Sequence, residues 1–224
     1  MSRVLAYCGF LHRPEISLPS TGVMAAAVQV MAAAGQRLLW SEVKWPLASE
    51  RMQKNAVEFH EVVHHIFRQT AVIPFRLLSV FEDERALAAF AAEHATAFIE
   101  DLERLKDCVQ MECVIFPTPS RVQANTGSGT AYLQEKAVML RSADAFAQSV
   151  RDAMRRMGRD VRVREGKNGT RIFVLVERGR EQEFRHAVST LGVPENLSRR
   201  ISGPWPAAEF LSERVRAPQI AGVK

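Results

Sequence analysis

The chain has 224 residues, of which 47% are hydrophobic and 25% are charged, and its formal net charge is +5. This length allows two compact domains with real cores, so no disulfide or metal is needed for folding. No stretch reaches the ~20 uninterrupted apolar residues of a membrane span, which excludes an integral membrane protein of the helical class.

Strand patterns come first along the chain. Residues 3–11 have β-type composition and no cleavage site after them, so they predict a first strand and not a signal peptide. Residues 22–43 are rich in alanine, which favours a helix, but Gly35-Gln36 interrupts them like a turn. We therefore predict a hairpin in this segment.

Helical periodicity follows. Apolar residues recur at three- and four-residue steps over 48–69 and again over 82–105, which predicts two helices. The short apolar run 72–78 between them contains Pro74, and a proline in such a run indicates an edge strand or a bulge.

The second half of the chain alternates regularly between strand and helix patterns. We predict, in order, a strand (109–116), a mobile loop (117–129), a long helix (131–157), two strands (160–164 and 170–177), a short helix (180–191) and a last strand (197–202). Gly158 is a suitable end for the long helix, and Asn168-Gly169 is typical of a tight hairpin. The order β-α-β-β-α-β is the ferredoxin-like one.

These patterns predict an α+β protein made of two two-layer domains. The N-terminal α+β domain would span residues 1–108. The ferredoxin-like domain would span residues 109–224 and would include the mobile loop 117–129.

The cysteines and arginines give weaker indications. Cys8, Cys108 and Cys113 are odd in number, and their spacing fits no common zinc or redox motif, so we expect buried or half-buried thiols in a reducing compartment. Much of the positive charge comes from arginines in the second half, which can bind nucleic acid or an acidic protein surface, or can simply be solvated: Arg155, Arg156, Arg159, Arg162, Arg164 and Arg171. No aromatic stacking pattern accompanies them, so we expect no nucleic-acid partner.

One motif points to catalysis. His60, Glu61 and His64 form H-E-x-x-H on a predicted helix, the spacing with which zinc proteases hold their metal and general base. The extended form of the motif would need a glycine and a histidine where this chain has Phe67 and Thr70. We therefore predict no metal, no cofactor and no catalytic residue, and we keep a zinc-dependent hydrolase as an alternative.

The last predicted strand ends in Ile201-Ser202-Gly203-Pro204-Trp205-Pro206. Two prolines around a tryptophan leave the chain few conformers, so the ring is placed reproducibly. Such a ring either packs within the fold, which we favour, or lies on a contact surface.

This ending resembles the terminal signature Ser-Gly-Pro-Trp-Pro-Pro-Tyr-Ser-Phe of the gas vesicle accessory family L/F. Three further blocks resemble that family in the same order: the helix with His60, Val62 and Val63, the run 72–76, and the helix start 129–133 after a strand with Glu112. The resemblance covers residues 3 to 211. The chain departs from the family pattern at two places. It has Leu77-Leu78-Ser79 where the family has Phe-Gly-Thr, and Ala207-Ala208-Glu209 where the family has Pro-Tyr-Ser.

The resemblance implies a non-enzymatic, cytoplasmic assembly protein associated with gas vesicles. Its expected partners are the small hydrophobic shell protein and other accessory proteins, with no membrane partner. A protein-binding module unrelated to gas vesicles is a further alternative. The residues that carry the family signature, or that would contact a partner, are Gly203, Pro204, Trp205, Pro206, Phe210, Tyr132 and Arg76.

Overall fold

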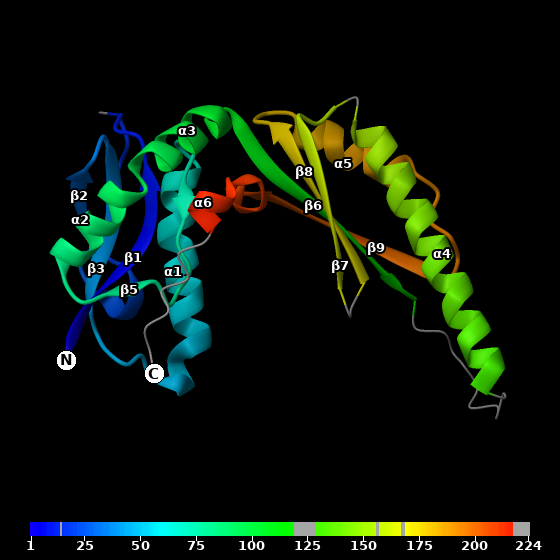
Figure 1. Cartoon of the computed structure of the whole chain (residues 1–224), viewed down its shortest axis with the longest axis horizontal. Helices are drawn as coiled ribbons and strands as arrows, with labels where there is room; N and C mark the ends of the chain where they lie inside the picture. Colours follow the sequence, from blue (N-terminus) through cyan, green and yellow to red (C-terminus); the bar gives the residue numbers. More distant parts are fainter. Residues whose placement is uncertain (14, 119–128, 156, 167–168, 217–224) are drawn as a thin grey trace. The chain divides into compact units, whose positions relative to one another are not determined.

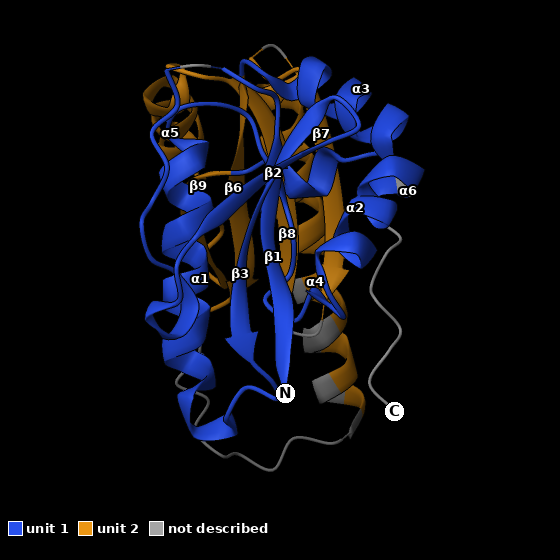
Figure 2. Ribbon diagram, turned by 90° about the vertical axis from the view of Figure 1, so that its left-hand side faces the viewer, with its two compact units in different colours: residues 1–107, 206–224 blue, residues 108–205 orange. Residues whose placement is uncertain are grey.

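The computed structural model describes residues 1–13, 15–118, 129–155, 157–166 and 169–216 (Figure 1). The chain divides into two compact units, coloured separately in Figure 2. Unit 1 comprises Met1–Asp107 together with Pro206–Lys224, and unit 2 comprises Cys108–Trp205. The described residues 206–216 therefore return to unit 1, whereas the sequence placed them in the second domain.

Unit 1 is built on a five-stranded antiparallel sheet. Its strands are β1 (Ser2–Phe10), β2 (Gln29–Ala33), β3 (Gln36–Lys44), β4 (Ile73–Pro74) and β5 (Val80–Phe81). Their order is β2-β3-β1-β4, and β5 also pairs with β1. Pro74 lies in the edge strand β4, as the apolar run with a proline predicts.

Helices pack on both faces of this sheet. Val4 and Ala6 of β1 pack against Leu87 and Ala91 of α2 (Glu84–Glu93). On the other face, the ring centroid of Tyr7 lies 5.1 Å from that of Phe59 in α1 (Met52–Phe67), which follows the short turn η2 (Ser49–Arg51). The α+β class is confirmed, but unit 1 has three layers where the sequence predicted two. Burial on both faces explains why β1 is an unbroken apolar run.

The alanine-rich segment forms a hairpin, as predicted. Strands β2 and β3 pair from Gln29–Trp40 to Ala33–Gln36, and the turn residues Ala34 and Gly35 have φ of 49° and 83°. Positive φ at both central residues matches the twist of two-residue hairpins. Pairing with β3 thus outweighs the helix propensity of the alanines. Before the hairpin, η1 (Val23–Ala25) is a single turn.

The helix predicted over 82–105 is two helices. Asp83 caps α2 by accepting a hydrogen bond from Ala86 N at 2.8 Å. Helix α2 ends at Glu93, and His94 alone separates it from α3 (Ala95–Leu105). One aromatic ring from each helix, Phe90 of α2 and Phe98 of α3, packs near Phe75, the residue that follows β4. Phe75 lies 6.0 Å from Phe90 and 6.2 Å from Phe98 between ring centroids.

The described end of the chain packs onto unit 1. It contains η3 (Ala208–Phe210) and α6 (Glu213–Arg216), and α6 contacts α3. The buried carboxylate of Asp101 accepts a hydrogen bond from Ser212 N at 2.7 Å and from Arg104 Nη2 at 2.5 Å. Arg104 also donates to Phe210 O at 2.7 Å. Asp101 and Arg104 together therefore hold the described residues 206–216 on unit 1.

Unit 2 has the predicted β-α-β-β-α-β order. Its elements are β6 (Cys108–Pro117), α4 (Gly129–Met154), β7 (Asp160–Gly166), β8 (Gly169–Glu177), α5 (Glu181–Thr190) and β9 (Leu197–Trp205). The strands are antiparallel in the order β7-β8-β6-β9. Most of the loop predicted over 117–129, namely 119–128, lies outside the described residues, as does Asn168 of the hairpin turn.

One face of this sheet is covered by α4 and α5, which lie on the same side of it in Figure 1. The buried side chains of the two helices include Val150, Met154, Phe184 and Val188. A Cβ on Gly158, just after α4, would lie 2.7 Å from Val174 Cγ1 of β8. Close packing of the chain on the sheet therefore requires glycine at this helix end.

The three cysteines are free and buried, as predicted. Burial raises the pKa of the Cys113 thiol to about 11 and raises that of Cys8 still further. Neither group is a thiolate at neutral pH, so neither is a nucleophile. None of the described helices combines the length and the apolar character that crossing a membrane requires.

Candidate functional site

The signature residues Gly203, Pro204 and Trp205 form a bulge in β9. Ser202 pairs with Glu112 and Trp205 pairs with Gln110, which leaves two residues of β9 opposite Met111 alone. The strand predicted to end at residue 202 therefore continues through the bulge to Trp205. Pro204 has no N–H to donate to the ladder, and a bulge is where a strand tolerates that loss.

Only glycine fits the first position of the bulge. Gly203 has φ +112°, and a Cβ there would lie 2.8 Å from both Gln110 O and Met111 Sδ. Arg185 of α5 donates a hydrogen bond to Gly203 O and ties the bulge to the helix layer. The glycine and proline of the signature are thus explained by the backbone of this strand.

A chain of polar contacts starts from the tryptophan. Trp205 Nε1 donates to Ser202 Oγ at 3.2 Å, and Ser202 Oγ donates to Glu112 Oε2 at 3.1 Å. Arg171 Nε donates to Glu112 Oε1 at 2.5 Å. These contacts join β9, β6 and β8 through one largely buried carboxylate.

The arrangement orients the side chains around Glu112. Both oxygens of Glu112 accept hydrogen bonds, one of them from a guanidinium, so the carboxylate is held as an ion-paired acceptor. Trp205 is half-buried, with its N–H bonded inside the network. The network fixes the direction of the ring.

From the sequence, Glu112 was named only within the family resemblance, and Ser202 and Arg171 were not predicted as its partners. A usable signal was present. Glu112 interrupts the apolar strand 108–116, and a carboxylate at such a position needs a hydrogen-bonding or cationic partner.

The remaining predicted site residues lie elsewhere. Phe210 is fully buried in unit 1, and Pro206 begins the return of the chain to that unit. Arg76 is exposed in a tight turn of unit 1, where its N–H donates to Ser79 Oγ at 3.1 Å. Tyr132 lies in α4, and its side chain is outside the described residues. Arg76 and Phe210 therefore belong to a different unit from the bulge.

The H-E-x-x-H motif lies on α1, as predicted. The rings of His60 and His64 stack with centroids 5.6 Å apart, and His64 also lies 5.9 Å from Phe67. Desolvation lowers the pKa of His64, and the charges of Arg68 and His60 lower it further. Over the described residues, no group of three or more histidine, cysteine or acidic side chains is placed to hold a metal.

Glu61 faces a different feature. With Glu58 and His65 it borders a cavity of about 370 Å³ between α1 and the segment 19–25. Glu58 Oε2 accepts a hydrogen bond from Met24 N at 2.8 Å, so this carboxylate holds the neighbouring loop. Glu61, the glutamate of the motif, thus lines the same cavity as Glu58, whose carboxylate holds the loop at Met24.

We expect the purified protein to contain far less than one equivalent of zinc, because His60 and His64 have no third ligand among the described side chains. Metal analysis of protein prepared without chelators measures this directly. A full equivalent that is lost in His64→Ala would instead support the hydrolase.

The fold and the bulge define a class of protein: an α+β chain of two units whose signature residues shape a strand end. The family model described as gas vesicle synthesis protein GvpL/GvpF matches residues 3–212, and the chain belongs to this family. A comparison with curated proteins found no match.

Two solved structures share the fold. The crystal structure of gas vesicle protein GvpF from Anabaena sp. PCC7120 is 16% identical, with a TM-score of 0.74 over 95% of this chain and 97% of that chain. The structure of GvpF from Microcystis aeruginosa is 14% identical, with a TM-score of 0.72 over 94% of this chain and 99% of that chain.

Proposed function

We propose that the chain is a non-enzymatic accessory protein of gas vesicle formation, which acts by binding the shell protein or other gas vesicle accessory proteins. The observation that carries this proposal is the family match over residues 3–212. The bulge at Gly203 and Pro204 supports it, because the residues that resemble the family signature have a definite structural purpose in β9.

The physical task of such a protein follows from its expected partner. A small shell subunit with exposed apolar surface aggregates unless another protein shields it or directs its assembly. A binding protein of this kind needs no cofactor and no turnover. The buried free thiols suit a reducing compartment, and we place the protein in the cytoplasm in association with gas vesicles.

The test is made in a gas-vesicle-producing cell. Deletion of the gene should abolish or deform the vesicles, and the full chain supplied in trans should restore them. Affinity capture of a tagged full chain should retain the shell protein or another accessory protein. Normal vesicles in the deletion strain, together with empty capture, would overturn the proposal.

We expect Trp205→Ala to lower the free energy of unfolding by about 1–3 kcal/mol, below the ~3–5 kcal/mol of a fully buried aromatic ring. The reason is that Trp205 is half-buried and bonds Ser202 through its N–H. Trp205→Phe is the matched control, since it keeps an aromatic ring while it loses the N–H donor and part of the apolar area. Thermal melting and partner capture are measured on the same variants. Unchanged melting with lost capture would make Trp205 a contact residue.

A further inference from the structure

The unit 1 sheet ends on one side in β2, which among the described strands pairs with β3 alone (Figure 1). Its five residues, Gln29–Ala33, include no charge and no proline, and they pair with β3 without a shift of register. An edge strand is a template for pairing with another chain, and proteins normally protect it with charges, prolines, bulges or short length. The residues of β2 provide no such protection.

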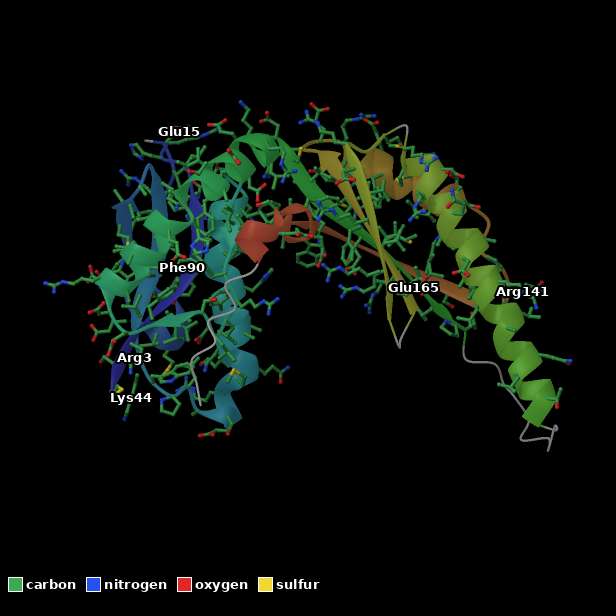
Figure 3. All side chains as sticks on the ribbon, in the orientation of Figure 1. Arg3, Glu15, Lys44, Phe90, Arg141 and Glu165 are labelled. Atoms are coloured by element: carbon green, nitrogen blue, oxygen red, sulfur yellow. The ribbon has the colours of Figure 1, made fainter. Side chains whose placement is uncertain are left out.

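The other edges of the two described sheets are protected. At the opposite side of unit 1, β4 and β5 are two residues long, and β4 contains Pro74. In unit 2, β9 has the bulge with Pro204, and β7 is rich in charged residues, including Glu165, which Figure 3 labels. The exception at β2 therefore indicates a strand that is kept open for pairing.

The hairpin geometry decides which backbone groups of β2 point outward. The pair beside a two-residue turn exchanges both of its hydrogen bonds, and bonded pairs then alternate with non-bonded pairs along the ladder. Ala33 and Gln36 form the pair beside the turn, so every second residue of β2, counted from Ala33, bonds to β3. The N–H and C=O groups of Val30 and Ala32 therefore point away from β3.

Contacts of the neighbouring backbone agree with this alternation. Two residues before Val30, the N–H of Val28 also points away from β3 and donates to Ser20 O at 3.1 Å. The chain then leaves the edge, because Ser17 N donates to Gln69 Oε1 at 2.8 Å, just after α1. Within the part of the chain that the structure describes, nothing bonds the four outward groups of β2.

We propose that β2 pairs with β2 of a second copy of this chain, antiparallel about a two-fold axis at Met31. In this register Val30 of one copy lies opposite Ala32 of the other, and the two residues exchange both hydrogen bonds. The axis repeats this exchange on the other side of Met31, so all four outward groups of each copy are bonded. A shifted register would bring one of these residues opposite Val28, whose N–H is already bonded, or opposite the turn.

The side chains of β2 also suit pairing with themselves. Met31 and Ala33 are partly buried against the core cluster that contains Leu87 and Ala91 of α2. At the axis the two Met31 side chains are direct neighbours, so the apolar cluster of one copy continues into that of the other. No like charges meet, because β2 has none. Since the paired strands are short, we expect a weak dimer whose fraction rises with protein concentration.

The register is tested by cross-linking the full chain. Two Cα atoms of a non-bonded pair lie about 4.5 Å apart, which a disulfide can bridge, whereas diagonal neighbours lie ~7–8 Å apart and cannot be bridged. M31C should therefore form a covalent dimer under mild oxidation with diamide, and A32C, one residue along the strand, should not. The native cysteines are buried and do not compete.

The backbone contact is tested by removing an outward donor. A32P deletes the N–H that would bond Val30 of the second copy, and it removes no hydrogen bond to β3. A32S keeps this N–H and is the matched control. Sedimentation of the full chain is measured from about 10 μM to 1 mM, the range of weak association. Thermal melting checks that every variant folds.

We expect the wild-type chain and A32S to dimerise alike, and A32P to need about tenfold more protein for the same dimer fraction, because each dimer loses two hydrogen bonds. The double variant M31C/A32P should lose most of the cross-link. A wild-type chain that stays monomeric over the whole range would overturn the proposal. So would equal cross-linking of M31C and A32C, or dimerisation that A32P leaves unchanged. The proposal does not depend on the gas vesicle role, so the two can fail separately.

Discussion

Gly203→Ala is expected to lower the free energy of unfolding by about 2–6 kcal/mol, a large part of the ~5–15 kcal/mol that stabilises a typical domain. Two costs combine at this position. An L side chain at φ +112° costs on the order of 1–3 kcal/mol, and forcing a methyl group into the 2.8 Å gap beside Gln110 O adds about 1–3 kcal/mol. Chemical denaturation measures the sum.

Two other glycines separate these costs. Gly179 has φ +95° but open space around it, so Gly179→Ala carries the conformational cost alone. Gly192 also has open space, and its φ lies outside the left-handed range, so Gly192→Ala should be nearly neutral. We expect stability to fall in the order Gly192, Gly179, Gly203. If Gly203→Ala unfolded like Gly192→Ala, the bulge would not have the geometry described.

The course of unit 2 was predictable because its signals are local. The strands β6, β7 and β8 and the helix α4 appear within a few residues of their predicted ranges, since alternation and three-to-four periodicity depend only on neighbouring residues. The hairpin β2–β3 was also predicted, because Gly35 marks a turn that the surrounding alanines do not.

The errors come from contacts between residues distant in the sequence. The break at His94 accompanies the contact of Phe75 with Phe90 and Phe98, and the periodicity within 82–105 gives no sign of that contact. The third layer of unit 1 depends on two helices reaching opposite faces of β1. A continuous apolar strand is compatible with this arrangement and does not prove it.

The candidate site likewise has features that residue type predicts and features that only the pairing of distant strands creates. The rigidity of Gly203-Pro204-Trp205 was predicted from residue type, whereas the bulge follows from the register of β9 against β6. Register also brings Arg164, Arg171 and Arg200 onto one face of the unit 2 sheet, because Arg200 joins the other two only when all four strands are aligned. From the sequence, Arg164 and Arg171 were grouped with arginines that lie in or beside α4, such as Arg155, and Arg200 was not included.

Phe210→Ala is expected to cost unit 1 about 3–5 kcal/mol, the range for truncating a fully buried phenylalanine. Phe210 is 0% exposed, and its carbonyl accepts a hydrogen bond from Arg104, which also bonds the buried Asp101. Loss of the ring should release the segment 206–216 from α3. Because the protein has two units, a single melting temperature is not sufficient, and hydrogen exchange measured segment by segment is the suitable readout.

The pattern of exchange decides to which unit the end of the chain belongs. We expect α3 to lose protection in Phe210→Ala while β6 and β8 keep theirs, because the described residues 206–216 group with unit 1. Phe210→Leu, which keeps most of the apolar volume, should cost less than about 1.5 kcal/mol. Leu133→Ala is the exposed control, since Leu133 is 64% exposed on α4 and its loss should change little. Equal loss of protection in α3 and in β6 and β8 would contradict the assignment, and loss confined to β6 and β8 would return this segment to the second domain, where the sequence placed it.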